Sequence, residues 1–236
     1  MNLILLEPQD FIDPQHARLS DARFKQILQV HGSQIGDQVR VGELNGLMGS
    51  GRITDLNEQA VTLAVQLDQQ PPAKLPLTVV LALPRPKMIR RIFRSLAELG
   101  VEQLIVINSY KVEKSFWQSP ALDPVKVRQY LVDGLQQAKD TILPQVQFHK
   151  RFKPFVEDEL PNIIAGSRAL IAHPALGEPC PHQLNERITL AVGPEGGFIP
   201  YEVEKLQAIG FEGVDLGERI LKVENALTTL IAKLYD

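Results

Sequence analysis

The spacing of apolar residues changes at the proline-rich segment 69–76, and this change constrains the fold more than any other feature of the sequence. Before it, apolar and polar residues alternate between turn signals such as Asn45-Gly46, which is typical of half-buried strands. After it, continuous apolar runs alternate with amphipathic helical stretches, which is typical of a mainly parallel sheet buried on both faces. The sequence therefore predicts a small β-rich domain over 1–72 and an α/β domain over 73–236.

In the first domain we expect a small barrel and one early helix, because Phe24, Ile27 and Leu28 have helical spacing. In the second domain the apolar runs predict strands at Leu77–Leu83, Leu104–Ile107, Ala169–Ala172, Ile188–Val192 and Val214–Leu216. The amphipathic stretches predict helices at Met88–Leu99, Val125–Ala138, Glu202–Ile209 and Val223–Leu234.

The net charge of −3 conceals an uneven distribution. Residues 73–154 contain 14 Lys and Arg against 6 Asp and Glu, a net charge of +8, between two acidic segments. Such a segment indicates a surface that meets a polyanion, and a solvated face paired with acidic segments is the alternative. The residues that we predict to bind RNA lie near the first predicted helix of this domain and after the next strand: Arg85, Lys87, Arg90, Arg91, Arg94 and Lys111.

Aromatic residues accompany the lysines in the segment 110–117. This mixture suits RNA, because aromatic rings stack on exposed bases. The alternative is that Phe116 and Trp117 anchor the loop to the core.

Several functional classes are disfavoured. Cys180 is the only cysteine, so intramolecular disulfides and thiolate zinc clusters are excluded and a reducing cytoplasm is expected. We expect no membrane span, no secretory signal and no metal site, because the sequence lacks a long apolar segment, a basic N-terminus and histidines at metal-motif spacing. Dinucleotide, P-loop and nucleophile-elbow fingerprints are also absent.

Two predicted strands end in unusual loops, at the carboxyl ends where parallel sheets bind ligands. Ile188–Val192 runs into 193–197 (GPEGG), whose glycines permit close approach of a ligand and offer N–H groups. Val214–Leu216 runs into 217–221 (GERIL). A tight turn explains either loop alone, whereas two such loops in succession favour a binding site.

The stretches 191–198 (AVGPEGGF) and 216–226 (LGERILKVENA) closely resemble the paired signature of the ribosomal RNA small subunit methyltransferase E family, one of the SPOUT methyltransferases. The similarity spans nearly the whole chain and includes Gly36-Asp37 and His173-Pro174. It implies a PUA-like β-barrel that binds RNA, then a SPOUT domain with a parallel sheet and a C-terminal trefoil knot. It also implies a homodimer that uses S-adenosylmethionine to methylate N3 of a uridine in small-subunit ribosomal RNA, free or in the small ribosomal subunit.

The same resemblance assigns roles to individual residues. Lys222 is the candidate cation for the uracil oxygens that gain negative charge, and Glu224 the candidate that orients Lys222 or accepts the N3 proton. A charged pair in the first turn of the last helix is the alternative. The residues assigned to the methyl donor are His173, Pro174, Gly193, Pro194, Glu195, Gly196, Gly197, Leu216, Gly217, Ile220 and Leu221.

The chain departs from the family pattern outside the donor loops. Lys222 replaces Arg, Asn225 replaces Thr, Asp140 stands where a helix end carries Arg, and Arg90 stands where a helix carries Glu. These positions leave open a non-catalytic or differently targeted RNA-binding paralogue. A nucleotide-dependent metabolic enzyme is a weaker alternative, because 84–86 (PRP) occupies the place of a phosphate loop.

Overall fold

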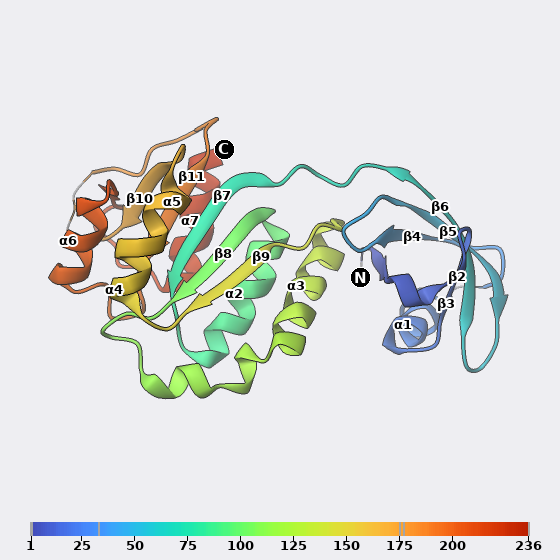
Figure 1. The fold of residues 1–236 in the computed structure, drawn as a ribbon. Coiled ribbons are helices and arrows are strands. Elements are labelled where there is room, and N and C mark those ends of the chain that lie inside the picture. The colour runs from blue at the N-terminus through green and yellow to red at the C-terminus, as the bar shows by residue number, and fades with distance from the viewer. Residues whose placement is uncertain (1, 33, 175, 177, 236) are drawn as a thin grey trace. The chain divides into compact units, whose positions relative to one another are not determined.

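The computed structural model describes residues 2–32, 34–174, 176 and 178–235, and the chain divides into two units (Figure 1). The first unit comprises the residues up to Ala73 together with Val132–Leu143, and the second comprises Lys74–Leu131 and the residues from Pro144 onward. The segment 132–143 joins the first unit through long-range hydrogen bonds. The Thr141 hydroxyl donates to the Gly46 carbonyl at 2.6 Å, and the Asn45 N–H donates to the Thr141 carbonyl at 2.8 Å. No local hydrophobic pattern encodes such contacts.

The first unit contains a barrel-like sheet and the early helix α1, as the turn pattern and the apolar spacing predict. The strand order is β1-β4-β5-β6-β3-β2, in which β1 and β4 are parallel and the other neighbours antiparallel. The core includes Phe24 and Ile27 of the helix. The elements are β1 (Ile4–Leu6), η1 (Pro8–Asp10), β2 (Phe11–Asp13), β3 (His16–Leu19), α1 (Ala22–His31), β4 (Gln38–Glu43), β5 (Met48–Leu56) and β6 (Val61–Gln69).

The second unit contains a six-stranded parallel sheet of order β12-β10-β11-β7-β8-β9. The strands are β7 (Leu75–Ala82), β8 (Val101–Ile107), β9 (Gln145–His149), β10 (Arg168–Ala172), β11 (Ile188–Val192) and β12 (Glu212–Val214). The apolar runs thus predict every strand except β9, and they place β12 two residues too late. β9 pairs only with β8, and most of its residues are exposed, so it carries no continuous apolar run.

Each of the four predicted helices of this unit is present: α2 (Pro86–Glu98), α3 (Pro124–Ala138), α6 (Pro200–Ala208) and α7 (Val223–Tyr235). Helix α2 buries the predicted apolar stripe that includes Ile89, Phe93 and Leu96. The remaining short elements are η2 (Lys114–Gln118), η3 (Pro120–Leu122), α4 (Phe152–Pro154), η4 (Phe155–Glu159) and α5 (Leu160–Ile164). In the part of the chain that the structure describes, no helix has the length and apolar character that crossing a bilayer requires.

Candidate functional site

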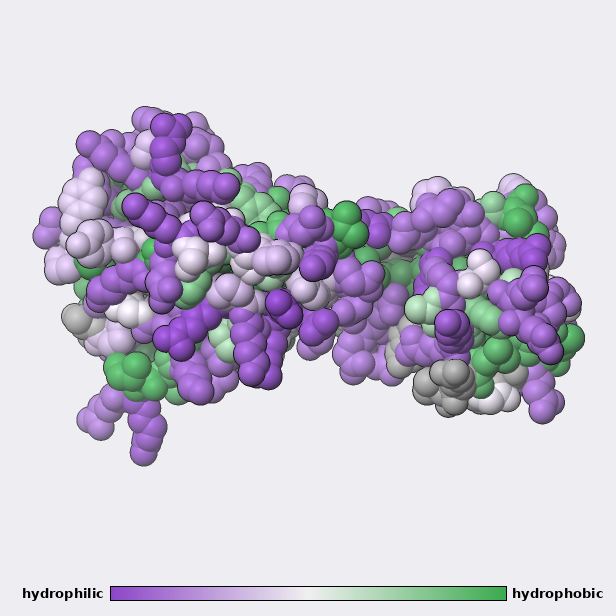
Figure 2. Space-filling model, turned by 90° about the horizontal axis from the view of Figure 1, so that it is seen from below, coloured by the Kyte–Doolittle hydropathy of each residue, from purple (hydrophilic) through white to green (hydrophobic). Residues whose placement is uncertain are grey.

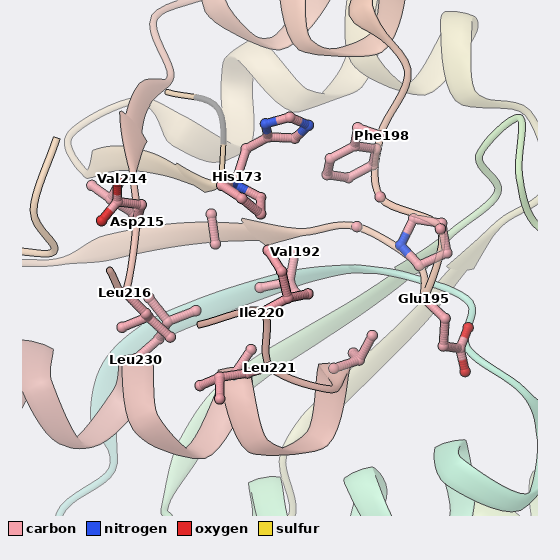
Figure 3. A pocket seen from close by; sticks show the side chains of 18 of the residues that line it. His173, Val192, Glu195, Phe198, Val214, Asp215, Leu216, Ile220, Leu221 and Leu230 are labelled. Atoms are coloured by element: carbon pink, nitrogen blue, oxygen red, sulfur yellow. The ribbon is translucent and has the colours of Figure 1, made fainter. Parts of the chain in front are cut away.

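A cavity of about 460 Å³ lies in the second unit at the carboxyl ends of β10, β11 and β12 (Figure 3). Three loops that follow these strands form its walls, and residues of α7 complete the lining. β10 pairs with both β11 and β12 in parallel, so the loops after these strands emerge at the same edge of the sheet. The cavity is therefore a direct product of the strand order.

Every residue that the resemblance assigns to donor binding lines this cavity. They are His173 and Pro174 after β10, Gly193, Pro194, Glu195, Gly196 and Gly197 after β11, and Leu216, Gly217, Ile220 and Leu221 after β12. These residues come from three separate stretches of the sequence. Their assembly in one place supports a common ligand.

The remaining lining residues are not among those that the resemblance assigns individually to the donor. They are Lys111, Ala172, Val192, Phe198, Val214, Asp215, Arg219, Val223, Ala226 and Leu230, of which Lys111 is predicted to contact RNA but not to line a cavity. Most are apolar side chains at strand ends or on α7. An apolar residue that lines a cavity has the same sequence signal as one that packs in the core, so the pattern could not separate them.

The cavity has an apolar middle and a carboxylate at each end (Figure 3). The rings of His173 and Phe198 lie on one side of Val192, and the side chains of Leu216, Leu221 and Leu230 lie on the other (Figure 3). Asp215 accepts a hydrogen bond from the Gly217 N–H at 2.9 Å, and Glu195 accepts one from the Arg85 N–H at 3.1 Å. This arrangement suits a flat apolar group between aliphatic side chains, with positive charge near a carboxylate.

The glycine loop after β11 leaves little room for side chains at several of its positions. A Cβ atom on Gly193 would lie 3.0 Å from the Phe198 nitrogen, and one on Gly196 would lie 2.8 Å from the Lys111 Cδ. Gly197 has a φ of 70°, which disfavours other residues. The Lys111 ammonium donates to the Gly196 carbonyl at 2.6 Å, so Lys111 supports this loop as well as lining the cavity.

Glu202 is a buried carboxylate that sequence reasoning did not select. Only 2% of the residue is exposed, and its oxygens accept from the Ile199 N–H at 3.0 Å, the Ser109 hydroxyl at 3.2 Å and the Tyr110 N–H at 2.7 Å. Glu202 thus joins the start of α6, directly after the glycine loop, to the loop after β8. Its place three residues after the helix N-cap is a capping signal that could have been noticed, although that signal does not reveal the burial.

The two catalytic candidates lie at the start of α7. Lys222 is exposed and sits between the lining residues Leu221 and Val223, but neither Lys222 nor Glu224 lines the cavity. Among the described residues, no hydrogen bond or ion pair joins Lys222 to Glu224. The catalytic roles of both therefore stay predictions.

The predicted RNA-binding residues of α2 and the preceding loop are accessible. Arg85, Lys87, Arg90 and Arg91 are exposed, whereas Arg94 is half-buried with its guanidinium 5.1 Å from the centre of the Tyr130 ring. The Arg85 N–H bond to Glu195 links the segment before α2 to the wall of the cavity.

The structure also gives the contacts or exposure of Trp117, Asp140 and Asn225, three positions singled out in the sequence. Trp117 is half-buried and its indole N–H donates to the Asn108 side chain at 2.8 Å, which supports the anchoring alternative. Asp140 is buried and accepts from the Ile142 N–H at 2.9 Å, while Asn225 is exposed. Within the described ranges, no group of three or more His, Cys, Asp or Glu side chains is placed to hold a metal ion.

Comparison with known proteins extends these observations. The chain is 29% identical over 238 residues to ribosomal RNA small subunit methyltransferase E of Treponema pallidum. This alignment covers 96% of this chain and 87% of the relative. It is 26% identical to the protein of the same name from Synechocystis, over 98% of this chain and 76% of the relative. Both alignments include the N-terminal unit.

Solved structures share the fold over nearly the full length. The crystal structure of ribosomal RNA small subunit methyltransferase E from Neisseria gonorrhoeae bound to S-adenosyl methionine matches with a TM-score of 0.76 and 20% identity, over 98% of this chain and 95% of that one. A probable rRNA methyltransferase from Porphyromonas gingivalis matches with a TM-score of 0.74 and 22% identity, over the same shares of the two chains. These likenesses confirm the α/β fold with a parallel sheet that the sequence predicts.

The family model described as the RNA methyltransferase domain matches residues 71–235. This match includes the whole parallel sheet and every loop of the cavity. The chain therefore belongs to the RNA methyltransferase family that this domain defines.

Proposed function

We propose that this protein transfers a methyl group from S-adenosylmethionine to N3 of a uridine in small-subunit ribosomal RNA. The observation that carries the proposal is the assembly of all the predicted donor-binding residues around one cavity. The names of the relatives from Treponema pallidum and Synechocystis support the RNA substrate. The donor named for the Neisseria gonorrhoeae structure supports the cofactor.

The chemistry of the cavity fits this donor. Its volume of about 460 Å³ lies in the range of small-molecule sites, and its apolar middle suits an adenine ring. Asp215 and Glu195 supply the carboxylates that a molecule with a sulfonium and an ammonium group requires. When bound, the donor supplies a methyl group that is already electrophilic, so the task left to the protein is to position the base and handle its proton.

Lys222 and Glu224 are the residues to which we assign this task. A cation near the uracil carbonyl oxygens stabilises the negative charge that develops as N3 loses its proton. The position of Lys222 between two lining residues suits that role, and Glu224 would orient the ammonium group or accept the proton. Alignment of donor and base supplies the rest, because positioning alone is worth about 7–11 kcal/mol in favourable cases.

Further features of the proposal rest on the family resemblance. We include RNA binding by the barrel-like first unit, a trefoil knot in the second, and a homodimer. Ile220 is a large apolar side chain with 76% exposure at the cavity, as expected of a surface that another copy covers. The single cysteine, Cys180, is consistent with work in the cytoplasm.

Two measurements test the proposal. Isothermal titration calorimetry with S-adenosylmethionine should show binding, and an absence of heat at millimolar donor would contradict an enzymatic role. Mass spectrometry of ribosomal RNA from cells that lack this protein should show one missing N3-methyluridine, restored by the wild-type chain. A methyl group missing from another atom or another RNA would instead identify a differently targeted relative.

A further inference from the structure

Tyr110 is an aromatic residue whose backbone is fixed and whose side chain is open to solvent. The residue is 78% exposed, between the buried Ser109 and the cavity-lining Lys111. Its N–H donates to the buried carboxylate of Glu202 at 2.7 Å, and the next turn is closed by the Val112 N–H, which donates to the Ser109 carbonyl at 3.0 Å. Single exposed rings are common on protein surfaces, but a tyrosine whose backbone is fixed beside a ligand cavity is well placed to stack on a bound partner.

The loops after β8 and β9 lie side by side where they leave the sheet. The Asn108 N–H donates to the His149 carbonyl at 2.9 Å, and the Lys150 ammonium lies 5.9 Å from the centre of the Trp117 ring. These loops carry exposed cations at Lys114, Lys150 and Arg151. We name these three cations together with Tyr110 the β8–β9 rim.

Among the described residues, no hydrogen bond or ion pair joins Lys114, Lys150 or Arg151 to a carboxylate, although Glu113 and Asp123 are exposed carboxylates of the loop after β8. The neighbouring Glu157 is already engaged, because it accepts from Lys205 at 2.6 Å. Lys150 approaches the Trp117 ring instead of a carboxylate. The rim therefore combines free positive charge with one exposed ring, which is the composition of a surface that binds unpaired nucleic acid.

We propose that the β8–β9 rim holds an unpaired RNA segment next to the target nucleotide, with a base stacked on Tyr110 and phosphates near Lys150 and Arg151. This inference rests on the proposed RNA substrate and adds the conformation in which the RNA is bound. Bases in a duplex hide their faces in the helical stack, whereas an unpaired base offers a face to the ring. A base whose N3 reacts must also leave any base pair, so an unpaired neighbour is chemically consistent.

The test compares binding of a single-stranded oligouridylate and of an RNA duplex of equal length. Tyr110→Ala should weaken oligouridylate binding about 5- to 150-fold, because stacking on a side chain contributes this much per base, while Tyr110→Phe retains it. Tyr201→Ala removes another exposed tyrosine, on α6, and should leave binding unchanged. Lys150→Gln with Arg151→Gln should reduce the slope of log affinity against log salt by about 1.4.

Two outcomes would overturn the inference: oligouridylate binding that does not depend on Tyr110, including no binding at all, or equal losses for single strand and duplex. Circular dichroism verifies that each variant is folded, and Tyr110→Leu, which keeps an apolar side chain without a ring, replaces Tyr110→Ala if that variant does not fold. Donor titration of the same proteins separates the two proposals. If donor binding and methyl transfer persist while Tyr110 proves irrelevant, only the rim is wrong; if oligouridylate binding depends on Tyr110 but no donor binds, only the proposed methyl transfer is wrong.

Discussion

Lys222 lies outside the cavity lining but next to it, which gives it a defined kinetic signature. A residue that stabilises charge only in the transition state lowers kcat when removed and leaves donor affinity unchanged. We expect Lys222→Ala to reduce the single-turnover rate of methyl transfer by about 100-fold, the size of effect seen when one charge-stabilising donor is lost.

Lys222→Arg is the matched control for this prediction, because it keeps the positive charge and should retain most of the rate. The donor dissociation constant of all three proteins is measured by calorimetry. Equal losses in donor affinity and in rate for Lys222→Ala would assign Lys222 to donor binding and remove it from the chemical step.

Glu202 does not line the cavity itself but supports the loops that do. The carboxylate accepts three hydrogen bonds in a nearly fully buried place, and Glu202→Gln would put an amide N–H₂ against those N–H and O–H donors. We expect a loss of about 1–3 kcal/mol in the free energy of unfolding, together with weaker donor binding because the glycine loop loses its support.

Glu204→Gln on the same helix is the control, since Glu204 is exposed and its loss should change stability by less than about 0.5 kcal/mol. Urea denaturation gives the free energies of unfolding, and calorimetry gives the donor affinity. Similar stabilities for Glu202→Gln and Glu204→Gln would show that the buried network contributes nothing to the fold.

At the scale of elements, sequence predicts what depends on local pattern. The strands buried on both faces and the helices with a clear apolar stripe, such as β11 and α2, are found where the periodicity puts them. The edge strand β9 is missed because it pairs with β8 on one side and is largely exposed to solvent, so it does not need a continuous apolar run. The attachment of 132–143 to the first unit is missed because it depends on hydrogen bonds between Thr141, Asn45 and Gly46, distant in sequence.

In the candidate site, too, the features with a local sequence signal could be predicted and the others could not. The glycine loops could be predicted because glycine itself indicates backbone freedom. The family resemblance identified the third loop of the cavity, at His173-Pro174. The supports of those loops could not be selected. Lys111 bonds Gly196, which is 85 positions away along the chain, and Glu202 bonds Ser109, which is 93 positions away. Only the strand order makes these residues neighbours.

Helix α2 is the element on which the electrostatic part of RNA binding can be tested. Arg90 and Arg91 are exposed, whereas Arg94 packs on Tyr130, so the first two are the ones to change. We expect Arg90→Gln with Arg91→Gln to flatten the slope of log affinity against log salt by roughly 1.5, because each lost phosphate contact removes about 0.7–0.9. Fluorescence anisotropy with a small-subunit ribosomal RNA fragment measures this slope.

The control for α2 is Arg187→Gln, whose guanidinium is already paired with Glu102 at 2.7 Å. Its slope should match that of the wild type. An unchanged slope for the α2 double variant would mean that this helix carries a solvated basic face and that the RNA binds elsewhere.

For RNA binding by the whole molecule, the place of the charged residues in the two units matters more than the net charge of −3. The basic residues of α2 and of the loops after β8 and β9 lie in the second unit, and Arg90 and Arg91 among them are exposed, so a negative total does not oppose an RNA partner. The two units also depend on different interactions. The second is held by a buried parallel sheet, whereas the first has a cluster in which Arg23 binds Asp10, Asp21 and the Leu5 carbonyl.

That cluster predicts which unit responds first to acid. Hydrogen bonds from Arg23 hold the pKa of the Asp21 carboxyl below its usual value of about 4. A lowered folded-state pKa means that the ionised form stabilises the fold, so this contribution is complete above about pH 4 and is lost as the pH falls towards the folded-state pKa. We expect amide hydrogen exchange, corrected for intrinsic rates, to show loss of protection in α1 and β1 as the pH falls below about 4, while β7 and β11 stay protected. Asp21→Asn should lower the protection of α1 at pH 7 and remove most of this acid response. If wild type and variant lose protection along the same pH curve, another group controls the acid sensitivity of the first unit.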